Sequence, residues 1–304
     1  MTVYFGERDR SGGAFLADLV VEAAASAGVG RSAVLRGTEG FGQKHRLQSS
    51  QLLSLSEDLP MIVVAVGDAV PVRAAADRVR SLAANGLVLV EKQGGPNQGS
   101  TGVDIWLRRG QRLGDGPAHV GVVRLLARHG ATAAVTLLGV DGSAGRRRER
   151  ARFFSSNTSV PLIVSATGPA AALARAGAQI SALLPGASLD FSSAPEPAFP
   201  GGWRRLTVYG SESPIADGTP LHSHLIRTVR ESGGSGATVL TGIHGFTGDA
   251  EPRGDSFLQV RRRVPVITEI VDTWDNCERW VEVAHGLGGE NTALAIAPVE
   301  VIPV

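Results

Sequence analysis

The chain of 304 residues contains a single cysteine, Cys277, and few aromatic residues, at 5%. One cysteine excludes an internal disulfide framework and a cysteine-cluster metal site, which suits a reducing compartment. The formal net charge is only +1, so no overall field attracts the chain to nucleic acid or to an anionic membrane. Scarce strand aromatics also disfavour an RNA-binding sheet, and we expect no nucleic-acid partner.

Long apolar runs are absent as well. No window approaches 18 uninterrupted apolar residues, and the first residues lead directly into a strand pattern without a basic region and an apolar stretch. We therefore expect no membrane span, no secretory signal and a cytoplasmic location. The apolar content of 43% is that of a globular protein, and the length allows two or three domains.

What the sequence does contain is a repeat. An apolar run leads into a glycine-rich turn at 34–42 (VLRGTEGFG), and the pattern returns at 239–246 (VLTGIHGF) and, more weakly, at 137–142 (LLGVDG). The first glycines of the three turns stand 102 and 103 residues apart: Gly37, Gly139 and Gly242. A repeat of this length is a domain.

Two further landmarks keep the same register. A glycine precedes the first expected helix of each copy, and a proline opens the third expected strand. The glycines are Gly13, Gly116 and Gly218, and the prolines are Pro60, Pro161 and Pro265. Between the copies lie stretches rich in glycine or proline, typical of linkers. The sequence thus predicts three domains, at 1–93, 102–192 and 203–304.

Each copy shows the same order of elements. In the first copy, alternating and apolar patterns predict strands at 2–6, 32–36, 61–66 and 87–91 and helices at 14–27 and 70–84. The order βαββαβ indicates an α+β, ferredoxin-like fold. A long polar excursion, residues 37–58 in the first copy, separates the second strand from the third.

The unusual loops of the first copy are expected at one edge of its sheet. The first helix returns the chain so that strands one and two run parallel, and both strands therefore end at the same edge. That edge holds the segment 7–10, the excursion and the turn 84–86. Loops on a rigid scaffold commonly form ligand sites.

The glycine-rich turn allows two interpretations. Its backbone N–H groups could bind a phosphate, because missing side chains permit close approach. It could equally be a tight turn that needs glycine for its conformation. Arg8 and Arg36 favour an anion, with Asp9 and Glu39 as counterions or as acceptors for ribose hydroxyls. Solvated surface ion pairs are the alternative for these four side chains.

Other chemistries find less support. The seven histidines are scattered, Cys277 falls in an expected helix, and no serine lies in a Gly-x-Ser-x-Gly turn, so we expect neither a metal site nor an enzyme. The basic run 146–152 could contact nucleic acid or anionic lipid, although a solvated loop is more typical of such a run.

The first copy resembles the DUF190 family of PII-like proteins. The similarity lies in Tyr4-x-Gly6-Glu7-x-Asp9-Arg10, Arg36-Gly37-x-x-Gly40-Phe41-Gly42 and Asp58-Leu59-Pro60. The third copy is similar through Gly242 and Gly245-Phe246. In the second copy Leu113 stands where Arg10 is expected, and that copy looks degenerate.

The resemblance implies a three-fold ring of ferredoxin-like subunits whose clefts bind small effectors, often adenine nucleotides. Three linked copies would close such a ring as an intramolecular pseudotrimer of a monomeric chain. The implied function is a non-enzymatic sensor of a small anionic effector, with no required cofactor. The family suggests a membrane transporter or fluoride exporter as its partner. A ligand-free scaffold for protein interactions is the alternative.

The residues expected to bind the effector come from the first copy and, in smaller number, from the third. They are Glu7, Arg8, Asp9, Arg10, Arg36, Gly37, Glu39, Gly40, Phe41, Gly42, Ser56, Asp58, Glu212, Gly242, Gly245 and Phe246.

Overall fold

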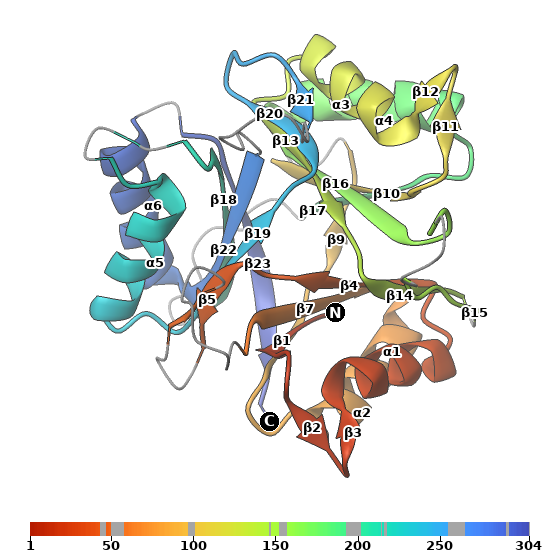
Figure 1. Cartoon of the computed structure of the whole chain (residues 1–304), viewed down its shortest axis with the longest axis vertical. Coiled ribbons are helices and arrows are strands. Elements are labelled where there is room, and N and C mark those ends of the chain that lie inside the picture. Colours follow the sequence, from red (N-terminus) through yellow and green to blue (C-terminus); the bar gives the residue numbers. More distant parts are fainter. Residues whose placement is uncertain are drawn as a thin grey trace.

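Three similar units make up the chain in the computed structural model (Figure 1). The structure describes residues 1–42, 47–49, 58–96, 101–145, 147–151, 157–192, 202–213, 215, 218–254, 265–289 and 292–303. The helices lie in three pairs on the outside, and the strands lie between them (Figure 1). Among the described residues, no helix combines the length and apolar character that crossing a membrane requires.

The first unit has four main strands and two helices. They are β1 (Thr2–Gly6), α1 (Leu16–Ala27), β4 (Arg31–Arg36), β7 (Pro60–Val66), α2 (Ala69–Arg80) and β8 (Leu87–Val90). The order across the sheet is β4-β7-β1-β8, and all neighbours are antiparallel. The first and second strands are therefore parallel to each other, as the sequence predicts.

The other two units repeat this arrangement. The second consists of β10 (Gly102–Arg108), α3 (Ala118–Arg128), β13 (Ala133–Leu138), β16 (Pro161–Thr167), α4 (Ala170–Leu183) and β17 (Ser188–Ser192). The third consists of β18 (Trp203–Ser211), α5 (Leu221–Glu231), β19 (Ala237–Thr241), β22 (Pro265–Thr273), α6 (Trp274–Gly288) and β23 (Leu294–Ile302). Their strand orders are β13-β16-β10-β17 and β19-β22-β18-β23.

Each unit buries an apolar core between its sheet and its two helices. In the first unit, Val20 and Ala24 of α1 and Val79 of α2 pack on Val3 and Val63 of the sheet. Helical spacing places the α1 residues on one face. The helix ends at Gly28, whose φ of 83° lets its N–H bond the carbonyls of Ala24 and Ala25.

The opposite faces of the three sheets meet in a fourth, central core. Equivalent positions of the units supply the same side chains there. Three leucines come from the second strands (Leu35, Leu137, Leu240) and three isoleucines from the third strands (Ile62, Ile163, Ile267), and each leucine pairs with the isoleucine of its own unit. The repeat seen in the sequence thus also repeats the surfaces through which the units pack together.

Strands exchanged between units connect them in a cycle. The excursion of each unit begins with a short strand that pairs with the second strand of another unit. Specifically, β5 (Glu39–Phe41) pairs with β19 of the third unit, β14 (Asp141–Ala144) with β4 of the first, and β20 (His244–Thr247) with β13 of the second. The sequence predicts polar loops here because strands of three or four residues carry too little periodicity to recognise.

The exchange explains the glycines of the repeated turn. A Cβ at Gly142 would lie 2.2 Å from the Ser32 carbonyl oxygen, and one at Gly245 would lie 2.1 Å from that of Ala134. Gly40 is nearly as close to Ala237, at 2.8 Å. Only glycine allows these strands to approach so closely. The turn therefore has a structural role in all three units.

The remaining edges are paired as well. β23 pairs with β8, and β9 (Gln93–Gly94), within the predicted linker, pairs with β17. The result is one sheet of twelve strands and one of seven, besides two small hairpins. The sheets end at strands of two residues each: β15 (Arg147–Arg148), β6 (Gln48–Ser49), β21 (Arg253–Gly254) and β9.

Two expectations about the first loop are wrong. The helix predicted from Ala14 begins at Leu16, because Ala14–Phe15 (β3) form a hairpin with Arg10–Ser11 (β2). In the second unit, the matching hairpin of β11 (Arg112–Leu113) and β12 (Gly116–Pro117) pairs Arg112 with Pro117, as Arg10 pairs with Phe15. Arg112, and not Leu113, is therefore equivalent to Arg10.

We predict that Phe41→Ala strongly destabilises the protein. Phe41 comes from the first unit but is 4% exposed within the core of the third, so truncation leaves a cavity there and should cost about 3–5 kcal/mol. Urea unfolding followed by circular dichroism measures the loss. Phe15→Ala is the control, since Phe15 is 44% exposed and should cost less than about 1 kcal/mol. Equal effects of the two substitutions would contradict the exchange.

Candidate ligand-binding cleft

A cleft of about 480 Å³ opens between the first and third units. Loops of the first unit form one wall and strands of the third form the other. The lining residues are Tyr4, Phe5, Gly6, Asp9, Phe41, Gly42, Gln48, Asp58, Pro60, Asn85, Gly86, Leu87, Trp203, Ser235, Gly236, Ala237, Thr238, Glu269 and Val271. The loops that the sequence places at one edge of the first sheet do meet here, through Asp9, Asp58 and Asn85.

Two carboxylates fix the loops of the first unit. Asp9 Oδ2 accepts a hydrogen bond of 2.9 Å from the N–H of Gly6, and Asp58 Oδ1 accepts one of 2.8 Å from the N–H of Arg8. Gln48 donates to the other oxygen of Asp58 at 3.4 Å. Carboxylates that accept backbone N–H groups order a loop in the way that helix caps do. The wall of the cleft is therefore held by polar side chains of the cleft itself.

Glu269 connects the cleft with a charged network at the centre of the molecule. The Tyr4 hydroxyl donates to Glu269 at 2.8 Å, and Arg205 bonds Glu269 at 3.1 Å and Glu91 at 2.7 Å. Burial, with the charge of Glu269, raises the pKa of Tyr4 well above its usual value. The phenol therefore stays protonated and acts as a donor. Tyr4 and Glu91 come from the first unit, so the network also joins the units.

Glu91, Arg205 and Glu269 of this network line a central chamber of about 710 Å³. Asp104 of the second unit also faces this chamber, and burial raises its pKa to about 6. At neutral pH most Asp104 side chains are ionised, and they titrate as the pH falls toward 6. Among the described residues, no group of histidine, cysteine, aspartate or glutamate side chains could hold a metal ion, here or elsewhere.

Four of the sixteen expected binding residues line the cleft: Asp9, Phe41, Gly42 and Asp58. Arg36 instead forms a surface ion pair of 2.9 Å with Glu7, the alternative that the sequence left open. Arg10 donates to the carbonyl of Gly13 and lies over the Phe15 ring, so it stabilises its own hairpin. The Arg8 side chain is exposed, and only its backbone N–H bonds a residue of the cleft, Asp58.

The other expected residues lie elsewhere. Gly37 and Gly40 pack against Pro60 and β19, and Glu39 faces α5. Ser56 lies outside the described residues. Those of the third unit are not part of this cleft: Gly242 and Gly245 pack against β13, Phe246 is in the core of the second unit, and Glu212 follows β18.

Sequence reasoning missed the wall contributed by the third unit. Trp203, Ser235 and Glu269 belong to this wall. Trp203 is the first residue of β18, where a strand pattern predicts a core residue. Glu269 is one of two acids in the largely buried strand β22. A charged residue in a buried strand was the available sign that Glu269 has a partner.

A second cleft of about 590 Å³ lies between the first and second units. It contains equivalent elements, with Gln111 in the loop after β10 and Ser143 in the exchanged strand. Its charged lining is mixed, with Arg31, Arg108 and Glu149, whereas the charged lining of the first cleft is acidic. The two clefts therefore share their construction and differ in their charges.

Comparisons with known proteins agree with the repeat. The family model described as "Uncharacterized ACR, COG1993" (DUF190) matches residues 1–93, 101–190 and 203–301. A UPF0166 protein of Aquifex aeolicus (strain VF5) is 32% identical over 97 residues, which is 32% of this chain and 90% of that protein.

Two solved structures show weak likeness. Aspartate kinase from Synechocystis has a TM-score of 0.30 at 10% identity, covering 97% of this chain and 42% of that one. An unknown protein from Galdieria sulphuraria has a TM-score of 0.20 at 11% identity, covering 66% of this chain and 99% of that one.

We predict very different effects for two arginines. Arg205→Met should destabilise the protein by about 3–5 kcal/mol, because it leaves Glu91 and Glu269 without their cation in a site where the side chains are 17% and 12% exposed. Arg36→Met removes a pair whose arginine is 50% exposed and should change stability by less than about 1 kcal/mol. Urea unfolding measures both, and a comparable loss for the two would refute the central role of Arg205.

Proposed function

Since the chain belongs to the DUF190 family, whose members resemble PII proteins, we propose that it is a non-enzymatic sensor. Its effector, an adenine nucleotide, would bind in the cleft between the first and third units. The observation that carries the proposal is the cleft itself. It lies between two units, it is formed by loops that polar contacts hold in place, and its lining combines aromatic rings with hydrogen-bond acceptors.

The lining suits the nucleoside part of such an effector. Trp203 and Tyr4 offer aromatic surface on which a base can stack. Asp9 and Asp58 supply acceptors for ribose hydroxyls, and Asn85 can bond the edge of the base. The described lining contains acids and no arginine or lysine, so the phosphates would extend outward to the surface where Arg8 and Arg36 are exposed.

The arrangement of the units supports an intramolecular pseudotrimer of ferredoxin-like domains. Each unit has the strand order of that fold, and the exchanged strands close the cycle within one chain. Effector binding beside Phe41 and Gly42 would act on the excursion that starts at β5. A change in the position of β5 would then alter the affinity for a protein partner, for which we propose a membrane transporter.

Binding of the effector can be tested by calorimetric titration with ATP, ADP, AMP and adenosine. We expect saturable binding that quenches tryptophan fluorescence. Trp203→Leu should weaken it by about tenfold or more, because stacking contributes about 1–3 kcal/mol per base. Trp274→Leu is the matched control, since Trp274 contacts Arg204 and does not line the cleft. If none of the four compounds binds, the ligand-free scaffold replaces the sensor.

The oligomeric state tests the pseudotrimer separately. Light scattering should give the mass of one chain, because each exchanged strand pairs with another unit of the same chain and none needs a second chain. A stable trimer of chains at low micromolar concentration would contradict the closed intramolecular ring, whatever the outcome of the titration.

A further inference from the structure

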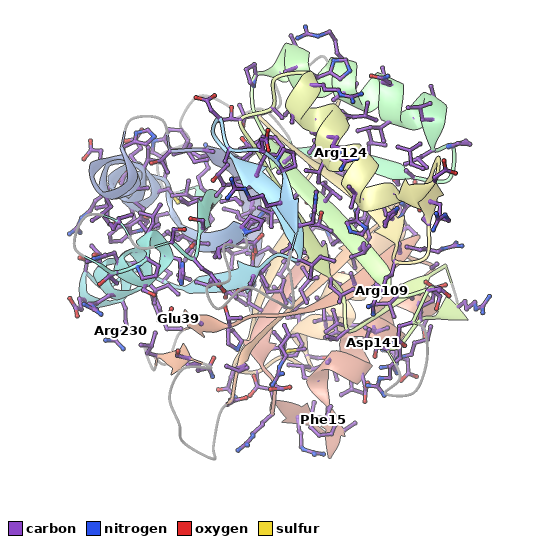
Figure 2. All side chains as sticks on the ribbon, turned by 45° about the horizontal axis from the view of Figure 1, so that its top comes forward. Phe15, Glu39, Arg109, Arg124, Asp141 and Arg230 are labelled. Atoms are coloured by element: carbon purple, nitrogen blue, oxygen red, sulfur yellow. The ribbon has the colours of Figure 1, made fainter. Side chains whose placement is uncertain are left out.

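The three units place one equivalent residue where an exchanged strand meets the first helix of another unit. We call these places the β5–α5, β14–α1 and β20–α3 corners. Glu39, Asp141 and His244 are equivalent, because each pairs with the same position of the neighbouring second strand and each precedes a glycine of the repeated turn. Figure 2 labels Glu39 and Arg230 at the first corner, Asp141 at the second and Arg124 on α3 at the third; it labels Arg109, which follows β10, farther from Arg124.

At the β5–α5 corner a carboxylate meets a basic helix. Glu39 accepts a hydrogen bond of 3.3 Å from Ser223, in the first turn of α5. Burial raises the pKa of Glu39, and the Ser223 hydrogen bond and the charges of Arg227 and Arg230 oppose that rise. A carboxylate near a helix N-terminus is also favoured by the helix dipole. Positive and negative charges therefore match at this corner.

The β14–α1 corner reaches the same balance with different residues. Asp141 is 6% exposed in its side chain and pairs with Arg148 at 2.5 Å and with Arg150 at 2.9 Å. Both arginines also contact Asp18, in the first turn of α1. The sequence predicts the basic run as a solvated loop, but two of its arginines form ion pairs with Asp18 and Asp141.

The β20–α3 corner has the cations but no acid. His244 stands where the others have a carboxylate, and it lies edge-on to His119 of α3, with ring centroids 5.9 Å apart. Arg124 is the seventh residue of α3, as Arg227 is of α5. Arg109 lies near His119. In the part of the chain that the structure describes, neither Arg109 nor Arg124 has an ion pair, and the first turn of α3 has no acidic residue.

Both imidazoles leave a ring nitrogen unused. The Nδ1 atoms of His119 and His244 are buried and have no hydrogen-bond partner among the described residues, although His244 is only 8% exposed. Buried polar atoms normally have partners, so these two nitrogens can accept a partner from outside the chain. Burial, His119 and Arg124 lower the pKa of His244 to about 4, and burial and Arg109 lower that of His119. Both rings are therefore neutral at pH 7.

We propose that the β20–α3 corner binds a small oxyanion, which takes the place that a carboxylate side chain occupies at the other two corners. His119 and His244 would donate N–H hydrogen bonds to it, and Arg109 and Arg124 would supply the charge. The first turn of α3, with its free N–H groups, adds to the attraction. This site lies between the second and third units and is independent of the nucleotide cleft.

The test is an NMR titration of the full chain with inorganic phosphate, with acetate as the carboxylate probe and chloride at matched ionic strength. Imidazole signals report on each histidine. We expect saturable shifts of His119 and His244 with phosphate or acetate and not with chloride, together with a rise in the pKa of both rings, because a bound anion favours their protonated forms. His222 of α5 is the internal control, since burial also lowers its pKa to about 4 and it lies outside the β20–α3 corner.

Two variants make the outcome decisive. His244→Glu supplies the missing carboxylate, and it should abolish the phosphate response of His119. Arg124→Gln changes an exposed side chain and should weaken phosphate binding by about tenfold or more. Glu39→Gln, at the equivalent position of another corner, should leave the response unchanged. The proposal is overturned if His119 and His244 shift no more than His222, or if His244→Glu and Arg124→Gln respond like the unaltered protein.

Discussion

Pairing of sheet edges is the constraint on which the rest of this structure depends. A four-stranded unit of this kind has two edge strands whose N–H and C=O groups seek partners. Here β14, β20 and β5 cover one edge of each unit, while β9 and the pairing of β8 with β23 cover the others. The enlarged sheets end at strands of two residues, two of which contain arginine, and such short strands offer little edge for pairing with another molecule.

This cyclic pairing also decides how far the units may diverge. Positions that form the exchange keep glycine, and positions of the central core keep leucine or isoleucine. Side chains beside these positions are free to differ, as Glu39, Asp141 and His244 do. The units therefore share one scaffold, while their clefts and corners carry different charges. A ring of identical subunits could not hold three different sites in this way.

The sequence was sufficient for the features that are local or repeated. The glycines near Gly37 and the prolines such as Pro60 marked the register of the copies, the family was recognised correctly, and β1 and α1 lie where periodicity predicts them to within two residues. The partner of each exchanged strand could not be predicted, because three residues such as Glu39–Phe41 carry no information about a strand some 200 residues away.

In the candidate cleft, too, some residues could be predicted from the sequence and others could not. Asp9 and Asp58 were expected from the loops of the first copy, because parallel strands end at one edge. For Arg36 the sequence left a ligand contact and a surface ion pair open, and the structure contains the ion pair with Glu7. Trp203 and Glu269 depend on how the third unit faces the first, which only the tertiary structure shows.

The direction of the exchange has a consequence for synthesis on the ribosome. When β14 and β20 leave the ribosome, their acceptors β4 and β13 have already been made, so both can pair at once. β5 is made early, but its acceptor β19 begins only at Ala237, and β8 waits still longer for β23. Domains fold in the order of their synthesis, and contacts between distant segments form slowly. The nascent N-terminal unit therefore carries one open edge, β8, and one unpaired strand, β5, until the last unit is complete. The last strands to be made are thus the ones that pair with the first unit.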